Sequence, residues 1–203
     1  MVRVPELERL PGPSPDVEVQ IWPGSELVAR VDEAMAIYVA AMGYHPSAGR
    51  ARAAATRTHT RYPGFVCVAA VDPHDDVLLG FGYGYSSRPG QWWHDLVRRA
   101  VTPETAELWM GDAFELSELH VRPDVQARGI GRALLQELAR RTTDTTVLLS
   151  TPDAETRAFR LYTDLGFVPL ARRHRFPGDA RPFAVLGARL PLAPPGRHRS
   201  FAP

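Results

Sequence analysis

The spacing of hydrophobic positions alternates between the two-residue period of strands and the three-to-four-residue period of helices. Val17, Val19 and Ile21 alternate with polar residues, which predicts a first strand. Apolar residues then recur at helical spacing from Leu27 to Met42, and Ser25 is placed to cap that helix. Through the middle of the chain strands and helices follow one another, which predicts a mixed α/β sheet with helices on both faces.

The remaining elements follow from the same two periods and from turn residues. An alanine-rich helix is expected at 48–58, and the turn DPHDD between two apolar strands predicts an antiparallel hairpin. Further strands are expected at 65–71, 77–86, 114–121, 146–150, 167–176 and 183–190, and helices at 91–100, 102–110 and 152–165.

One of these strands carries glycine on one face and aromatic residues on the other. Gly80, Gly82 and Gly84 alternate with Phe81 and its aromatic neighbours. Glycine weakens a strand, so a row of it predicts that something packs closely against that face. A helix and a ligand are the two candidates.

Composition and the positions of the proline residues divide the chain into three parts. Prolines crowd residues 1–16, which we expect to form a flexible arm, and the proline-rich residues 191–203 are expected to be a disordered tail. Residues 17–190 then form a single domain, in which 87–113 is a helical insertion. Three of the 4 tryptophans lie in this insertion, so it either covers the core or serves as a lid over a pocket.

Charge and cysteine content exclude several classes of function. The net charge of +1 gives no electrostatic reason to expect a nucleic-acid partner. Cys67 is the single cysteine and lies in an apolar run, which predicts a buried thiol and excludes a multi-cysteine metal site; no metal ligand set is expected. No apolar run approaches the roughly 20 residues that span a bilayer, and we expect a cytoplasmic protein without a membrane partner.

The most informative stretch runs from Phe114 to Leu138, as a strand, a glycine-containing loop and an amphipathic helix. Gly129 and Gly131 fall where the loop becomes the helix, so backbone can approach an anion closely. The first N–H groups of a helix have no internal partner, and Arg128 and Arg132 add charge. The loop lacks the lysine of a Walker motif and the third glycine of a dinucleotide fingerprint.

Two segments together identify a family. ELHVRPDVQARGIGRALL resembles the coenzyme A-binding motif of the GNAT superfamily of N-acetyltransferases, with Gln126, Gly129 and Gly131 at the motif positions. Downstream, AFRLYTDLGF resembles the end of the family's tyrosine-bearing helix. Where that family often has an asparagine that contacts the cofactor, seven residues before the tyrosine, this chain has Glu155, a departure that concerns one side-chain contact and not the site as a whole.

The resemblance implies a fold, a donor and a set of site residues. The fold would be a mostly antiparallel twisted sheet with a splayed central strand pair, and the donor would be acetyl-CoA. Tyr162 would protonate the departing thiolate. The strand residues would pair with the pantetheine arm and the loop residues would hold the pyrophosphate: Leu119, His120, Val121, Gln126, Ala127, Arg128, Gly129, Ile130, Gly131 and Arg132.

The proton acceptor and the acceptor substrate are less well defined. Glu115 lies where the histone-acetylating branch of the family has its base, Glu118 lies nearer the cofactor, His120 is a further option, and ordered water is an alternative. The expected partner is a small-molecule amine, with a protein N-terminus and a non-catalytic acyl-CoA-binding module as alternatives; a homodimer is compatible with the sequence. The regions that build the acceptor pocket in this family here carry Tyr38, His45, Trp92, Trp93, His94 and Trp109.

Overall fold

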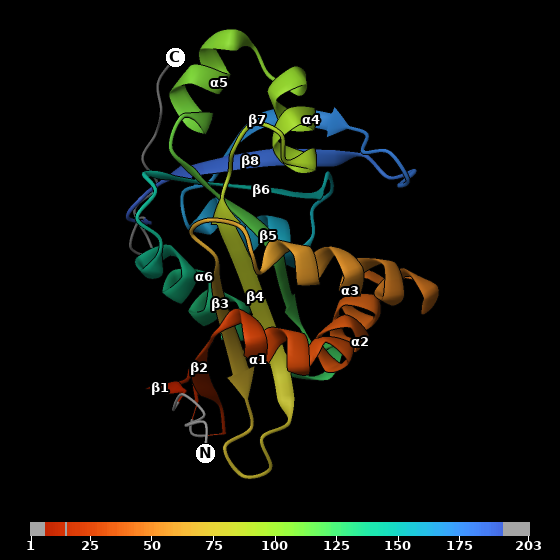
Figure 1. Ribbon diagram of the computed structural model, residues 1–203, viewed down its shortest axis with the longest axis vertical. Coiled ribbons are helices and arrows are strands. Elements are labelled where there is room, and N and C mark those ends of the chain that lie inside the picture. Colours follow the sequence, from red (N-terminus) through yellow and green to blue (C-terminus); the bar gives the residue numbers. More distant parts are fainter. Residues whose placement is uncertain (1–6, 15, 193–203) are drawn as a thin grey trace. The chain divides into compact units, whose positions relative to one another are not determined.

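The computed structural model (Figure 1) describes residues 7–14 and 16–192. Its chain divides into two compact units. Among the described residues, the first unit comprises 7–14, 16–85 and Ser117–Thr142, and the second comprises Ser86–Leu116 and 143–192. Within the described residues, none of the helices combines the length and the apolar character that crossing a membrane requires.

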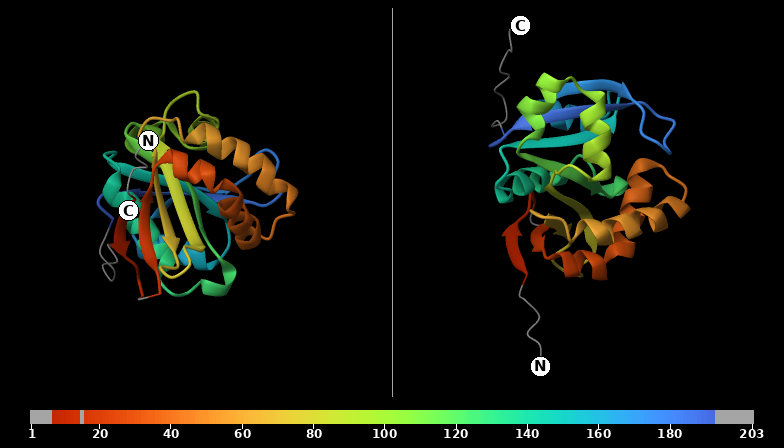
Figure 2. Two further views of the ribbon diagram at one scale, coloured as in Figure 1. Left: turned by 60° about the horizontal axis from the view of Figure 1, so that its bottom comes forward. Right: turned by 45° about the horizontal axis from the view of Figure 1, so that its top comes forward.

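Four antiparallel strands begin the sheet in the first unit, and Figure 2 shows β2 to β4 side by side. They are β1 (Glu8–Pro11), β2 (Glu18–Trp22), β3 (Val66–Val71) and β4 (Leu78–Ser86). The expected hairpin is confirmed, since β3 pairs with β4 and the Asp72 side chain accepts a hydrogen bond from the N–H of His74 in the turn. The aspartates of this turn therefore hold its backbone, as their positions predicted.

Helices cover both faces of these strands (Figure 1). On the aromatic face of β4, the helices α1 (Gly24–Ala29), α2 (Val31–Met42) and α3 (Ser47–His59) share one hydrophobic core with Phe81 and Tyr83. On the glycine face lies α6 (Ile130–Arg141), whose Leu138 packs at Gly82. The glycine row of β4 therefore admits a helix side chain, one of the two predicted candidates.

The first helical region differs from the prediction in two ways. A single helix capped by Ser25 was expected, but α1 begins at Gly24 after Pro23, without a side-chain cap. The helix is interrupted at Arg30, whose backbone leaves the helical region and whose guanidinium bonds Glu33 and Asp76. The apolar period continues through this break, so hydrophobic spacing alone could not locate it.

In the second unit, β6 (Thr146–Pro152), β8 (Phe183–Arg189) and β7 (Val168–His174) form an antiparallel sheet. The insertion at 87–113 forms α4 (Trp92–Ala100) and α5 (Pro103–Met110), and Thr102 caps α5 as expected by accepting a hydrogen bond from Thr105. Both helices pack on this sheet through a shared core, and their role as a lid stays a prediction. That core consists of Trp93, Val97, Ala106, Met110, Ala113, Leu148, Phe176, Phe183 and Val185.

The strand β5 (Ala113–Val121) contributes residues to both units. Its parallel pairing with β6 covers three residue pairs, from Ala113↔Thr146 to Glu115↔Leu148. A central strand pair that splays apart is expected to bond in this way, over a short stretch of each strand. Within the part of the chain that the structure describes, the sheet has eight strands in the order β1-β2-β3-β4-β5-β6-β8-β7, mixed but mostly antiparallel, as the resemblance implied.

The structure differs from two further expectations, one in the N-terminal arm and one at the start of a helix. Residues 8–11 lie inside the expected flexible arm but form β1, because β2 offers an edge to which even a four-residue segment can bond. The helix expected at 152–165 begins later, as α7 (Arg157–Asp164), because the Thr156 hydroxyl caps it by accepting from Phe159 N–H. The expected tail, 191–203, lies almost wholly outside the described residues.

The close packing at Gly80 makes a stability prediction. A methyl group at Gly80 would lie 2.9 Å from the carbonyl oxygen of His120, which belongs to a strand and cannot rotate away. We expect Gly80→Ala to lower the free energy of unfolding by about 1–3 kcal/mol, measured by urea denaturation. In the control Gly111→Ala, the nearest atom is 3.7 Å away and the backbone is helical. An unchanged free energy for Gly80→Ala would contradict the packing argument.

Candidate active site

The predicted phosphate loop connects the end of β5 to the start of α6, all within the first unit. After a single 3-10 turn at Pro123–Val125, Gln126 donates a hydrogen bond from Nε2 to the carbonyl oxygen of Val121, at 3.1 Å. Ala127 and Gly129 both have positive φ angles, 66° and 83°. The loop is therefore anchored by Gln126 while its backbone takes the left-handed turns that precede the helix.

The start of α6 has the features of an anion site. Gly129 is its N-cap and supplies no side-chain hydrogen bond. The helical ladder opens with the bond from Ala133 N–H to the Gly129 carbonyl oxygen, 3.0 Å, so the N–H groups of Ile130 and Gly131 precede it. Arg128 is exposed beside this turn, and Arg132 is half-buried within it. Together, amide donors, helix dipole and arginine charge suit a phosphate.

The last residues of β5 lie directly against the glycine face of β4. The missing side chain of Gly80 faces the carbonyl oxygen of His120, and that of Gly82 faces the Leu119 side chain, each with 2.9 Å to an added methyl group. Val121 is buried, and the backbone of Arg122 donates a hydrogen bond to Leu79 at 2.9 Å. Glycine at these two positions thus allows β5 to approach β4 closely.

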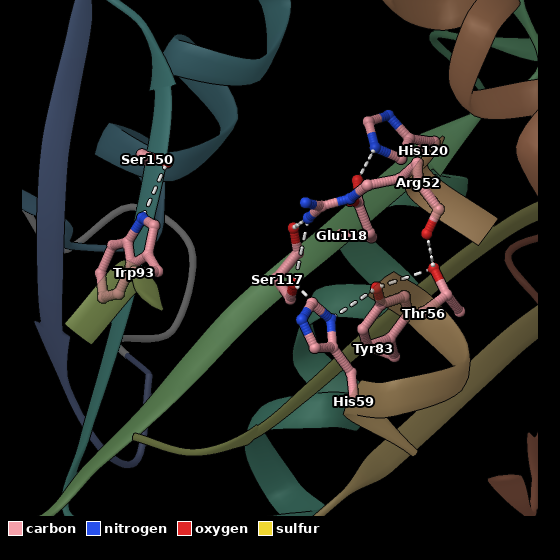
Figure 3. A network of polar contacts seen from close by, with 9 residues as sticks. All are labelled: Arg52, Thr56, His59, Tyr83, Trp93, Ser117, Glu118, His120 and Ser150. Atoms are coloured by element: carbon pink, nitrogen blue, oxygen red, sulfur yellow. Dashed lines mark hydrogen bonds and ion pairs between the residues drawn. The ribbon is translucent and has the colours of Figure 1, made fainter. Parts of the chain in front are cut away.

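Glu118, one of the two predicted carboxylates, lies in a buried polar network in the same unit (Figure 3). Its side chain is 4% exposed. One carboxylate oxygen forms an ion pair with Nε of Arg52, and the other contacts Nε2 of His120. Nη2 of Arg52 also donates to the hydroxyl of Ser117, at 3.2 Å. Arg52 therefore joins α3 to two successive residues of β5.

The network continues to the aromatic face of β4 (Figure 3). The Tyr83 hydroxyl lies 3.1 Å from Thr56 Oγ1 and 3.1 Å from His59 Nδ1. His59 Nδ1 also lies 3.5 Å from the hydroxyl of Ser117. Thr56 and Tyr83 are fully buried, so these contacts replace the water that the hydroxyl groups leave on folding.

Burial and the ion pair set the charges in this network. Burial raises the pKa of Glu118, but the Arg52 guanidinium and the His120 contact lower it by more, so the carboxyl stays ionised. Burial lowers the pKa of Arg52, and the Glu118 carboxylate outweighs that effect and raises it. Burial, with Arg52 nearby, lowers the pKa of His59 to about 4. At neutral pH the network therefore holds one ion pair and a neutral His59.

Sequence reasoning missed the α3 members of this network. Arg52, Thr56 and His59 were counted only as part of an alanine-rich helix, although their spacing of four and three residues places them on one helical face. That spacing is a signal that could have been used. It could not show that the face meets Glu118 and Tyr83, which come from strands 24 to 66 residues later.

The other predicted catalytic residues lie in the second unit. Tyr162 is on α7, is 6% exposed and has its ring 5.5 Å from that of Phe167, just after Gly166 ends the helix with a φ of 87°. Glu115 is 2% exposed and pairs with Leu148 in the parallel register. Glu155, at the family's asparagine position, is exposed in the bend before α7.

The residues expected to line the acceptor pocket differ in the unit to which they belong and in their exposure to solvent. In the first unit, the ring of Tyr38 packs edge-on against His120, with 5.2 Å between centroids, while His45 is exposed. In the second unit, Trp92 is 58% exposed, whereas Trp93 donates from Nε1 to Ser150 Oγ at 3.1 Å. His94 is buried against Ser87 beside a cavity of about 380 Å³ between α4 and α5.

Comparison with known proteins gives the family. Residues 63–169 match the model of the acetyltransferase (GNAT) domain. A GCN5-like protein acetyltransferase of Mycobacterium tuberculosis is 37% identical over 198 residues, which cover 84% of this chain and 96% of that protein. The chain belongs to the GNAT acetyltransferase family.

Solved structures agree with this assignment at the level of the fold. A Salmonella typhimurium protein, determined with its cofactor acetyl-CoA, matches with a TM-score of 0.57 at 16% identity, over 86% of this chain and 94% of the other. The ribosomal-protein-S18-alanine N-acetyltransferase of Escherichia coli matches with a TM-score of 0.56 at 15% identity, over 90% of this chain and 99% of the other.

GNAT acetyltransferases use acetyl-CoA, and the loop of this family member fits its pyrophosphate. The fit rests on the uncapped start of α6 and on the two positive-φ residues before it. A side chain that capped α6 would occupy the amide donors that a phosphate needs. Loop and helix therefore have the chemistry of a coenzyme A cradle.

The lowered pKa of His59 makes this acetyltransferase sensitive to acid. Between pH 6.5 and about 4 the unfolded chain binds a proton at His59 that the folded chain does not, so acidification favours unfolding. We expect the wild type to lose more stability than His59→Gln when the pH falls from 7 to 5, as measured by urea midpoints. The exposed His74, changed to Gln, serves as the control. Equal losses in the wild type and His59→Gln would contradict the assignment.

Proposed function

We propose that this GNAT acetyltransferase transfers the acetyl group of acetyl-CoA to a primary amine of a small molecule, by direct attack in a ternary complex. The observation that carries the proposal is the uncapped N-terminus of α6, reached from β5 through two positive-φ residues. It gives a donor site for acetyl-CoA next to a strand that carries buried ionisable side chains. Acetyl-CoA supplies a thioester whose acyl carbon an amine can attack.

The residues around the loop divide into two proposed binding roles. The backbone of Leu119, His120 and Val121 binds the pantetheine arm, and an N–H group of this segment polarises the thioester carbonyl. The pyrophosphate is held at the loop and the first turn of α6, by Gln126, Ala127, Arg128, Gly129, Ile130, Gly131 and Arg132.

Proton transfer requires an acid and a proton acceptor. Tyr162 is proposed to give its phenolic proton to the departing thiolate, and its nearly complete burial suits a group that reacts away from water. The acceptor of the amine's proton is proposed to act from β5, which carries both Glu115 and Glu118. The carboxyl of Glu118 is ionised, which supports a role in proton transfer for the face of β5 on which Glu118 lies.

A protein acceptor is the second candidate function. The Mycobacterium tuberculosis relative is named a protein acetyltransferase, and at 37% identity it covers most of this chain. The small-molecule reading relies on aromatic side chains in the acceptor regions, such as the exposed Trp92 and the half-buried Tyr38. Aromatic surface favours a moderately apolar amine.

The two candidates can be separated by measuring thiol release from acetyl-CoA with a panel of acceptors. The panel contains phenylethylamine, spermidine, an aminoglycoside, a peptide with a free N-terminus and a lysine-containing peptide with a blocked N-terminus. We expect the highest kcat/KM with a small, partly apolar amine. Preference for either peptide would contradict the small-molecule proposal and support the protein acceptor, and preference for the polar aminoglycoside would contradict the apolar pocket.

The role of Tyr162 is tested by Tyr162→Phe, which removes only the hydroxyl group. We expect kcat to fall on the order of 100-fold, because a general acid contributes about that much or more. The rise in melting temperature with acetyl-CoA should persist, since a ligand of the folded state stabilises it whether or not turnover occurs. Tyr62→Phe, which removes a hydroxyl group from a half-buried tyrosine of the first unit, is the matched control. Unchanged kcat in Tyr162→Phe would remove this residue from the mechanism.

A further inference from the structure

Both oxygens of the Glu118 carboxylate are already bound in the folded protein (Figure 3). Arg52 Nε contacts Oε1, and His120 Nε2 contacts Oε2. Arg52 is in turn held by Ser117, so the guanidinium cannot swing away without losing a second contact. A carboxylate in these contacts is a poor direct acceptor for the proton of an incoming amine.

The same contacts define the state of the His120 imidazole. A neutral imidazole has one N–H and one nitrogen with a lone pair. Because Nε2 faces an ionised carboxylate, the proton lies on Nε2 and the lone pair lies on Nδ1. No hydrogen bond to Nδ1 occurs among residues 7–14 and 16–192. The ring is fixed by Tyr38, whose edge-on contact has centroids 5.2 Å apart, and by Phe81 at 5.7 Å.

We propose that Nδ1 of His120 accepts the proton of the substrate amine, and that Glu118, clamped by Arg52, is the positioning residue that orients this imidazole. The inference rests on the proposed acetyl transfer to an amine and names the proton acceptor on β5. His120 then has two functions. Its imidazole accepts the proton, and its backbone is part of the segment proposed to bind the pantetheine arm.

The proton transfer is balanced as follows. An N–H bond of the substrate ammonium breaks, the proton forms a new bond to Nδ1, and the neutral amine keeps the electron pair with which it attacks the acyl carbon. The resulting imidazolium remains bonded to the Glu118 carboxylate through Nε2–H. Loss of the Nδ1 proton to water returns His120 to its starting state.

The surroundings of His120 hold its imidazole in one orientation. The Glu118 carboxylate on β5 contacts Nε2, Arg52 on α3 contacts the other oxygen of that carboxylate, and the Tyr38 ring on α2 packs against the imidazole. With Gln in place of Glu118, Nε2 loses the carboxylate that orients the ring.

The test compares kcat/KM of His120→Gln, Glu118→Gln and the double variant, with the best amine of the panel and across pH. We expect His120→Gln to lose on the order of 100-fold at neutral pH and to recover as rising pH deprotonates the amine in solution. Glu118→Gln should lose about 10-fold, and the double variant no more than His120→Gln, because the two residues act as one unit. His74→Gln is the matched histidine control.

Folding and cofactor binding are checked in the same variants. Circular dichroism and the melting-temperature rise with acetyl-CoA should be retained. Glu118→Gln leaves Arg52 without its partner. If that variant fails to fold, the double variant Arg52→Met/Glu118→Gln, in which both charges are removed, is measured in its place. Activity of His120→Gln within twofold of the wild type, or a double variant about 10-fold less active than His120→Gln, would overturn the proposal.

A measurement without substrate separates this inference from the proposed function. Nitrogen-15 NMR of the histidine rings in the wild type should show His120 as the Nε2–H tautomer near pH 8, a state that Glu118→Gln should weaken. An Nδ1–H tautomer would overturn the proposal even in an active enzyme. If the wild-type enzyme turns over none of the acceptors, the acetyl-transfer function itself is refuted, and the proton transfer with it. The contact between Glu118 and His120 would still stand as a feature of the structure.

Discussion

The close approach of β5 to β4 is the constraint on which the first unit depends. It is possible because Gly80 and Gly82 have no side chains where the carbonyl oxygen of His120 and the side chain of Leu119 lie. With β5 held there, Leu119 packs at the glycine face, while Glu118 reaches Arg52 of α3 on the aromatic face. The same strand leads directly into the loop that Gln126 anchors and into α6.

A second consequence is electrostatic. Bringing Glu118 under α3 removes a carboxylate from water, which would favour its neutral form if no partner were present. Arg52 supplies the opposite charge, and the Thr56, His59 and Tyr83 groups satisfy one another around it. Buried ion pairs are poor sources of stability, so an arrangement this complete is better explained by the need to hold specific groups in place.

The predictions from sequence succeeded where local physical chemistry is decisive. The hairpin at Asp72, the cap at Thr102 and the helix end at Gly166 all depend on a few adjacent residues. The break at Arg30 and the strand at 8–11 were not predicted, since each depends on a partner distant in the sequence: Asp76 for the first, β2 for the second. Helix α7 started late because the hydroxyl of Thr156 overrides the apolar period before it.

The sequence by itself determined the family and, with it, the acetyl-CoA donor, because the motifs that identify the family consist of contiguous residues. The conformation of the loop before α6 is also set locally, by glycine and by a helix start. Only the tertiary structure decided which side chains surround Glu118. Arg52 lies 66 residues before it, and no spacing rule connects a helix face to a strand that pairs elsewhere in the sheet. Electrostatic partnership is a property of distances in space, and those distances exist only after the chain has folded.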